Sequence, residues 1–353
     1  MQAFVYQAHS QRVVFGFGTL ATIGDELSAL GLSRALVLST PQQLDSADAL
    51  ARQLGERAVG VYGKATMHTP VEVTEDAMLV VRELGADCVV SLGGGSTTGL
   101  GKAIAFRTDL PQIVVPTSYA GSEATPILGE TERGEKVTKK HPRILPEVIV
   151  YDVDLTMTLP ASMTVTSGMN AIAHAIEALY TRERNPIISM LAQQGIEALA
   201  RALPAIRVNG NDREARSDAL YGAWACGTCL GAVGMALHHK ICHVLGGSFN
   251  LPHAETHTVI LPHATAYNER AVPELLAPAA RALGATSAGG GLWDFASGLG
   301  APMTLAEIGM QQGDLDRVAD LACANPYWNP QPMVRDEIRS LLDDAFFGRR
   351  PGG

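Results

Sequence analysis

The sequence is poor in aromatic and charged residues, and it has no excess of basic side chains. Phe, Trp and Tyr make up 5% of the 353 residues, and Asp, Glu, Lys and Arg together make up 18%. Acidic residues outnumber basic ones by 36 to 27, which gives a formal net charge of -9. Because binding to nucleic acid or to an anionic membrane requires concentrated Lys and Arg, this balance argues against both kinds of partner. A hydrophobic content of 46% with 36 glycines is instead typical of a tightly turned α/β enzyme.

A long apolar segment and a disulfide pattern are also missing. No run reaches the roughly eighteen apolar residues that a membrane span requires, so we expect a soluble protein. The five cysteines are odd in number and follow no secretory signal, which favours a reducing, cytoplasmic setting. Cys226 and Cys229 form a C-x-x-C within a helical run of small residues, where two buried thiols are a simpler interpretation than a redox or metal site.

The first half of the chain alternates short β-branched runs with amphipathic stretches. This order is the signature of a doubly wound parallel sheet, in which helices connect the strands. A hairpin turn is expected at 133–136, before a returning strand at 148–151. The runs that predict buried parallel strands lie at 34–38, 58–62, 88–92 and 112–116.

From residue 155 onward the strands nearly vanish, and Ala-rich amphipathic stretches predict an all-α domain. We therefore expect two domains, 1–154 and 155–353, in line with the usual domain size of roughly 100 to 200 residues. A helix break is expected at Pro262. The expected helices of the second domain are 164–180, 187–203, 212–233 and 240–246, followed by short helices within 301–347.

A glycine-rich loop joins the strand at 88–92 to a helix expected at 99–106. The three consecutive glycines at 93–95 let the backbone approach a phosphate closely, and the following helix N-terminus offers free N–H groups and a favourable dipole. The loop therefore predicts a pyrophosphate site, with a plain tight turn as the alternative. A second loop, 116–123, follows the next strand and is expected to contact the same ligand.

The end of the second strand bears on the choice of cofactor. It reads Leu38-Ser39-Thr40-Pro41, without the acidic residue that often binds the ribose hydroxyls of NAD. A 2'-phosphate would therefore meet no repulsion there, and we expect both NADH and NADPH to be accepted. The candidate cofactor-binding residues are Thr40, Gly93, Gly94, Gly95, Ser96, Lys102, Thr117 and Ser118.

Six of the ten histidines lie close together in the second half. Core packing alone does not need six imidazoles, so this stretch predicts a functional site, with hydrogen-bonded core histidines as the alternative. His239 and His243 are four residues apart on an expected helix, as are Asn170 and His174, so each pair shares a face. His238 points about 100° away from His239 and is expected outside the pocket. The six are His238, His239, His243, His253, His257 and His263.

Five motifs follow one another along the chain: GGGSTTGLGKA (93–103), PTSYAGSEAT (116–125), MNAIAHAIEA (169–178), HKICHVLG (239–246) and LPH (251–253). Their order and spacing resemble the iron-containing (group III) alcohol dehydrogenases of the dehydroquinate-synthase-like superfamily. The resemblance implies an N-terminal NAD(P)-binding domain, an all-α C-terminal domain and an active site in the cleft between them. The reaction it implies is hydride transfer to or from a small carbonyl compound.

Two positions depart from that family's pattern. The family's glycine motif reads G-G-G-S-x-x-D, whereas this chain has Gly99 in place of the carboxylate. The family's metal ligands are an Asp and three His; here Asn170 takes the Asp position, and His174, His239 and His253 take the others. Four neutral ligands leave the charge of a divalent cation uncompensated, so no tightly bound metal is expected. The alternative is a metal-dependent (Fe or Zn) alcohol dehydrogenase acting on a small alcohol or aldehyde, in which Asn170 still ligates.

Those departures, together with YAGSE at 119–123 and ANPYWNP at 324–330, resemble the branch of the superfamily that reduces maleylacetate. This resemblance implies reduction of the carbon-carbon double bond by NADH or NADPH to give 3-oxoadipate, during bacterial breakdown of resorcinol-type or chlorinated aromatics. A lyase or synthase on the same scaffold, using nicotinamide transiently, is a further alternative.

Without a metal, protonated imidazoles and other donors must stabilise the charge that develops on the 4-oxo oxygen of the substrate. His243 is the first choice for the general acid, because it matches no metal ligand of the family yet lies between two residues that do. His174, His239 and His253 are expected to bind the dianionic substrate or its developing enolate. The strand-forming N-terminus and long apolar helices favour a homodimer. The candidate substrate-binding residues are Tyr119, Lys140, Arg143, Asn170 and Tyr327.

Overall fold

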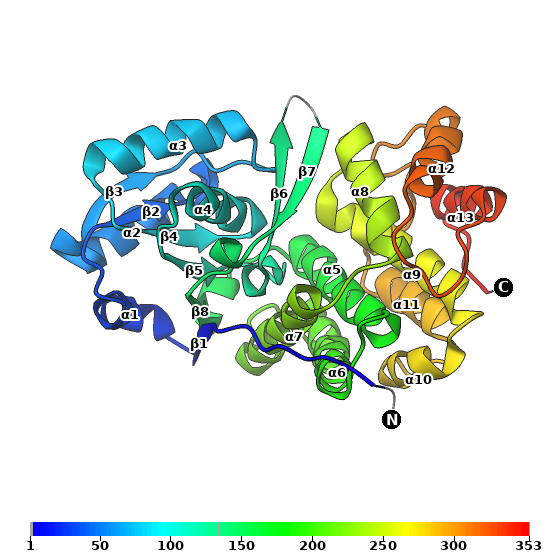
Figure 1. Ribbon diagram of the computed structural model, residues 1–353. Helices are drawn as coiled ribbons and strands as arrows, with labels where there is room; N and C mark the ends of the chain where they lie inside the picture. Colours follow the sequence, from blue (N-terminus) through cyan, green and yellow to red (C-terminus); the bar gives the residue numbers. More distant parts are fainter. Residues whose placement is uncertain (1–2, 133–134, 353) are drawn as a thin grey trace. The chain divides into compact units, whose positions relative to one another are not determined.

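The computed structural model describes residues 3–132 and 135–352 of the chain. The chain forms two compact units, one of His9–Leu159 and one of Pro160–Gly353 together with Met1–Ala8. The first is an α/β unit with a parallel sheet and the second is helical, as Figure 1 shows. The predicted fold class is therefore confirmed. The division between the units falls after Leu159, a few residues beyond the expected one at 154.

Six parallel strands form the sheet of the α/β unit, in the order β1-β8-β5-β4-β2-β3. The neighbouring strands β4 and β5 are buried at every residue, which explains their continuous apolar sequence, because such a sheet is covered on both faces. The strands are β1 (Arg12–Gly16), β2 (Ala35–Leu38), β3 (Ala58–Tyr62), β4 (Cys88–Gly93), β5 (Gln112–Pro116) and β8 (Val148–Asp152).

Helices cover both faces of this sheet. Successive residues of a strand point to opposite faces, and β2 illustrates the result. Val37 lies in an apolar cluster with Ile23 and Leu50, whereas Leu36 lies in a second cluster with Leu100. The first cluster brings α1 and α2 to one face, and the second brings α3 and α4 to the other. The helices are α1 (Ile23–Ala29), α2 (Leu44–Leu54), α3 (Val71–Leu84) and α4 (Gly95–Thr108).

A separate antiparallel hairpin, β6 (Ile127–Glu132) and β7 (Glu135–Lys140), follows β5 in the chain. The turn expected at 133–136 is wrong in its extent, because Glu135 and Lys136 pair with β6 as part of β7. Glu132 of β6 lies opposite Glu135 of β7. The rest of the predicted turn, 133–134, lies outside the described residues.

The helical unit is built around α5, which is buried along most of its length and packs against α6, α7 and α9. The contact between α6 and α7 depends on small residues. A Cβ atom on Gly222 of α7 would lie 2.8 Å from Leu199 of α6. Cys226 and Cys229 are buried on α7 as free thiols. The helices are α5 (Ala161–Tyr180), α6 (Pro186–Val208), α7 (Arg213–Ala232), α8 (Leu237–Phe249), α9 (His253–Glu269), α10 (Pro273–Ala282), α11 (Ala288–Gly298), α12 (Leu315–Ala324) and α13 (Arg335–Phe347).

The helix break expected at Pro262 is wrong, because α9 continues through this residue to Glu269. A proline inside a helix removes one backbone hydrogen bond. Residues 256–265 are buried, and their packing outweighs that loss. Among the described helices, none is by itself long and apolar enough to cross a membrane; α7 and α8, bent by 94° at their junction, reach such a length and composition only when taken together.

Candidate active site

The candidate cofactor-binding residues follow three neighbouring strands of the α/β unit. In the sheet order, β4 lies between β5 and β2, so the carboxyl ends of all three strands meet at one edge. The carboxyl ends of these strands and the residues just after them include Gly93–Ser96, Thr117 with Ser118, and Thr40. Direct contacts join two of these loops: the backbone N–H of Thr117 donates to the carbonyl of Gly93 at 3.1 Å. Ligands of open parallel sheets bind at such an edge.

Close packing explains the glycines of this loop. A Cβ on Gly93, where φ is 153°, would lie 2.5 Å from Oγ1 of Thr97, and one on Gly94 would lie 3.1 Å from Oγ of Ser118. Gly94 is the N-cap of α4, and Gly95, the first residue of the helix, is exposed. α4 therefore begins four residues earlier than expected, with its first N–H groups at the loop. This arrangement suits a pyrophosphate.

Lys102 lies seven residues after Gly95 on α4. Its ammonium contacts the segment that follows β5 rather than the loop glycines. Nζ donates to the carbonyls of Thr125 and Ile127 at 2.8 and 2.9 Å, to Oγ1 of Thr125 at 2.9 Å, and to the carbonyl of Ser122. Burial lowers the pKa of Lys102 to about 7. These bonds attach the loop after β5 to α4, which gives Lys102 a supporting position behind the candidate phosphate site.

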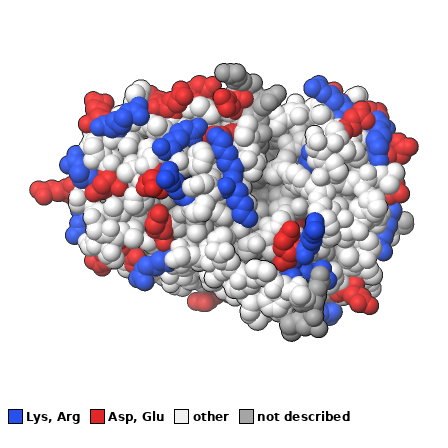
Figure 2. All heavy atoms as spheres, viewed as in Figure 1, with Lys and Arg blue, Asp and Glu red and all other residues white. Residues whose placement is uncertain are grey.

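The α/β unit also contains three of the candidate substrate-binding residues. Tyr119 is fully buried, whereas Lys140 and Arg143 are exposed. Arg143 is paired with Asp109 at 3.0 Å. Figure 2 shows several Lys and Arg side chains side by side over the region of α4 and the β6–β7 hairpin, among acidic side chains. Local positive charge suited to a carboxylate is thus present on an otherwise acidic chain.

The histidines predicted to form a site come together inside the helical unit. Asn170 and His174 lie on α5 and are buried, as is His239 on α8. Nδ1 of His174 lies 3.0 Å from Nε2 of His239. The rings of His253 and His257, one turn apart at the start of α9, have centroids 4.3 Å apart, and the ring of His257 lies 5.1 Å from that of His239.

A fully buried carboxylate, Glu177, completes this cluster and was not among the predicted site residues. Oε2 of Glu177 lies 2.8 Å from Nδ1 of His239. The same carboxylate accepts from the backbone N–H groups of Ala236 and His238, both at 2.7 Å, at the start of α8. The signal in the sequence was its spacing, since Glu177 follows His174 by three residues and shares its helix face.

His243, the candidate general acid, lies on α8 one turn after His239 and is half-buried. Its Nδ1 lies 2.9 Å from the hydroxyl of Tyr327. Burial, and next the charge of Glu177, raises the pKa of the Tyr327 phenol. The ammonium of Lys240 lies 5.5 Å from the centre of the Tyr327 ring, and burial lowers the pKa of Lys240. Two of the predicted site residues, His243 and Tyr327, are thus in contact although they lie 84 positions apart in the sequence.

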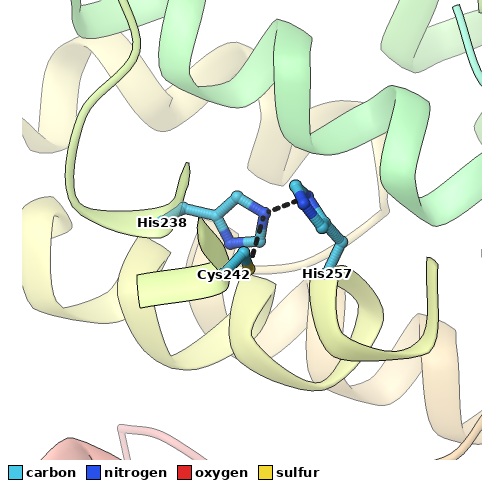
Figure 3. A group of neighbouring side chains, drawn as sticks. All are labelled: His238, Cys242 and His257. Atoms are coloured by element: carbon cyan, nitrogen blue, oxygen red, sulfur yellow. Dashed lines mark hydrogen bonds between the residues drawn. The ribbon is translucent and has the colours of Figure 1, made fainter. Parts of the chain in front are cut away.

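His238 points to a second group, shown in Figure 3. Its Nε2 lies 3.0 Å from Nδ1 of His257 and 3.7 Å from Sγ of Cys242, and the ligand atoms of all three residues fall within 4.8 Å of one another. Burial, with the nearby histidines, holds the pKa of both imidazoles well below the usual range, so both are neutral.

The spacing of this trio suits a metal ion, but its surroundings do not. Metal-bound histidines almost always donate the second ring N–H to an acceptor. Nδ1 of His238 and Nε2 of His257 have no hydrogen-bond partner among the described residues. We therefore interpret His238, Cys242 and His257 as a hydrogen-bonded core cluster beside the candidate site.

The residues at the family's metal position also fit a divalent ion poorly. Asn170, His174, His239 and His253 are neutral donors, so none of them neutralises the charge of the ion. Glu177, the carboxylate of this cluster, contacts His239 through Nδ1, on the side of the ring opposite His174, and already accepts from two backbone groups. The donor set therefore lacks the anionic ligand of the family.

The fold and the site define a known class of oxidoreductase. The model of the iron-containing alcohol dehydrogenases matches residues 10–153, and the C-terminal model of the Fe-containing alcohol dehydrogenase family matches residues 164–346. The chain therefore belongs to the iron-containing alcohol dehydrogenase family.

Within that family the chain is similar to maleylacetate reductases over its full length. The maleylacetate reductase of Rhizobium sp. (strain MTP-10005) is 60% identical over 99% of this chain and 100% of its own length, and that of Burkholderia cepacia is 54% identical with the same coverage. The crystal structure of maleylacetate reductase from Agrobacterium tumefaciens superposes with a TM-score of 0.96 at 61% identity, covering 99% of this chain and 100% of that one. The 1,3-propanediol oxidoreductase structure, 24% identical over 98% of this chain and 100% of that one with a TM-score of 0.91, shares the fold.

Proposed function

We propose that this protein reduces the carbon-carbon double bond of maleylacetate with NADH or NADPH, giving 3-oxoadipate in bacterial breakdown of aromatic compounds. The observation that carries the proposal is the similarity, over the full length, to proteins named maleylacetate reductase. The departure from the metal-ligand pattern at Asn170 agrees with it, because reduction of a conjugated double bond can be assisted by hydrogen-bond donors alone.

The cofactor proposal rests on the loops at the edge of the sheet. The exposed N-terminus of α4 at Gly95, with Gly93 and Gly94 beside Thr117 and Ser118, is suited to the pyrophosphate of NADH or NADPH. Thr40 follows β2 where an acidic residue would repel a 2'-phosphate. We therefore expect the two cofactors to differ in kcat/KM by less than about a thousandfold.

In the proposed reaction, hydride from the cofactor adds to one alkene carbon, negative charge develops on the conjugated 4-oxo oxygen, and the neighbouring carbon takes a proton. His174, His239, His253 and Asn170 bind the substrate or its enolate. His243 donates the proton. Its contact with Tyr327 supports this role: in the imidazolium form of His243, Nδ1–H donates to the Tyr327 oxygen and the Nε2 hydrogen is the one transferred, which leaves a neutral ring whose Nδ1 accepts from the Tyr327 hydroxyl. Lys140, Arg143 and Tyr119 remain predicted substrate contacts.

A metal-dependent alcohol dehydrogenase is the second candidate, and one observation favours it. His239 is hydrogen-bonded through Nδ1 to a carboxylate, as metal-bound histidines commonly are. The absence of an anionic ligand at Asn170 argues in the other direction, and we propose that no tightly bound metal takes part.

The deciding experiment is an assay of NADH oxidation with maleylacetate, carried out with and without prior treatment with a chelator. Continuous loss of NADH that is unchanged by the chelator is the expected result. A small aldehyde serves as the control substrate for the second candidate. Activity that disappears with the chelator and returns with iron or zinc would contradict the metal-free scheme, and absence of turnover with maleylacetate would contradict the reaction itself.

We also propose that the enzyme acts as a homodimer in the cytoplasm. The exposed side chains of Phe4, Val5 and Tyr6 in the N-terminal segment agree with a surface covered by a partner. Light scattering coupled to size-exclusion chromatography measures the mass directly, and the mass of a single chain would contradict the dimer.

A further inference from the structure

Glu177 is surrounded by hydrogen-bond donors at both oxygens. Oε2 accepts from the backbone N–H of Ala236 and contacts Nδ1 of His239, and Oε1 accepts from the backbone N–H of His238 and from the Tyr180 hydroxyl at 3.3 Å. The Tyr180 hydroxyl itself accepts from the side-chain amide of Asn268 at 3.1 Å, so its own hydrogen is directed to Glu177. A buried carboxylate in these contacts acts as an acceptor only. Nδ1 of His239 must therefore carry the hydrogen of their bond.

This requirement gives the next hydrogen bond a direction. In a neutral imidazole one nitrogen is a donor and the other is an acceptor. With its hydrogen on Nδ1, His239 has a lone pair at Nε2, the atom that lies 3.0 Å from Nδ1 of His174. His174 therefore donates from Nδ1, and its Nε2 is the remaining acceptor atom of that ring.

We propose that Glu177 is a positioning residue that sets the direction of the chain from His174 through His239 to Glu177. The proposal rests on the proposed function to the extent that His174 and His239 bind the substrate. A reversed chain would place hydrogen on Nε2 of both rings and change the atom that His174 presents to a ligand. Turnover, and not binding of the cofactor, is expected to depend on this direction.

A purely structural role for Glu177 makes a different prediction. Its carboxylate accepts two backbone N–H groups at the start of α8, and an anion there stabilises the helix. If that were its whole role, removing the charge would lower stability while His239 kept its hydrogen on Nδ1. The ring nitrogen of His239 that carries the hydrogen, once the charge of Glu177 is removed, therefore distinguishes a positioning role from a purely structural one.

The experiment is nitrogen NMR of protein with 15N-labelled histidine, in which protonated and unprotonated ring nitrogens have distinct shifts; the His239 signals are assigned by their loss in His239→Gln. We expect Nδ1 of His239 to be protonated in the wild type, and Glu177→Gln to yield a population protonated on Nε2. The same variant should lower kcat by about a hundredfold, with the affinity for NADH unchanged. Tyr180→Phe is the matched control, since it removes a donor to Oε1 without touching His239, and it should leave the tautomer unchanged and kcat within a few-fold of the wild type.

The wild-type spectrum is decisive even if Glu177→Gln fails to fold. Hydrogen on Nε2 of His239 in the wild type would overturn the proposal, as would a Glu177→Gln protein with lowered kcat and an unchanged tautomer. The spectrum needs no substrate, so these outcomes are distinct from failure of the proposed function, which is measured by turnover of maleylacetate in the wild type.

Discussion

Nδ1 of His243 lies 2.9 Å from the hydroxyl of Tyr327, a contact between residues 84 positions apart that joins α8 to the segment before α13. A phenol in this position can orient the imidazole and fix its tautomer. The pair therefore offers a test of the general acid that separates the donor from the residue that orients it.

His243→Ala should lower kcat by about two to four orders of magnitude, because it removes proton transfer in the transition state. Tyr327→Phe keeps the imidazole and should cost less, about tenfold. Steady-state kinetics with maleylacetate measures both, and titration with NADH followed by fluorescence checks that the cofactor still binds. A His243→Ala enzyme with kcat near that of the wild type would refute the assignment.

Asn170→Asp should raise the affinity for Fe²⁺ or Zn²⁺ at least about tenfold over that of the wild type, because it adds the anionic ligand that the donor set lacks. Calorimetric titration of metal-free protein measures the affinity, with Asn170→Ala as a matched control that adds no charge. Tight binding of metal by the wild-type protein, equal to that of the variant, would show that the four neutral donors are sufficient.

Gly99, the position at which the family has a carboxylate, lies against the side chain of Thr69. A Cβ on it would lie 2.3 Å from Oγ1 of Thr69, whose methyl carbon is farther away at 3.8 Å. Gly99→Ala should lower the free energy of unfolding by about 1–3 kcal/mol.

The same change in a Thr69→Ala background should be neutral or stabilising, since the clash is gone and alanine favours the helix by about 1 kcal/mol over glycine. Denaturant unfolding of the four proteins of this cycle measures the coupling. Equal costs of Gly99→Ala in the two backgrounds would contradict the clash.

Lys102 offers a test by pH. Burial lowers its pKa to about 7 in the folded protein, whereas an unfolded lysine has its ordinary pKa of 10.5. Between these values the unfolded chain binds more protons, so the stability contributed by this position rises with pH from about 7 and levels off near 10.5. The free energy of unfolding of the wild type, relative to that of Lys102→Met, should therefore rise by up to about 1.4 kcal/mol per pH unit in that window.

Denaturant unfolding at pH 7, 8 and 9 measures this difference, in which titrations common to both proteins cancel. A difference that does not change with pH would mean that the surrounding oxygens of Ser122, Thr125 and Ile127 keep the ammonium charged throughout.

Much of the fold follows from local sequence. The strands at 58–62 and 112–116 were predictable to the residue, because β-branched apolar runs report local burial directly. The prediction fails where packing overrides a local rule. Pro262 is incompatible with a regular helix, yet buried contacts on both sides of it keep α9 continuous.

By itself the sequence determined the type of most elements, the family, and the faces on which Asn170, His174, His239 and His243 lie, since helical periodicity is a local property. Tertiary structure alone decided which side chains and carbonyls are hydrogen-bonded to one another. Glu177 contacts His239 across 62 residues, and Lys102, from the predicted phosphate-binding motif, donates to carbonyls more than twenty residues away. Hydrogen-bond partners distant along the chain depend on how the elements pack, and no local pattern encodes that.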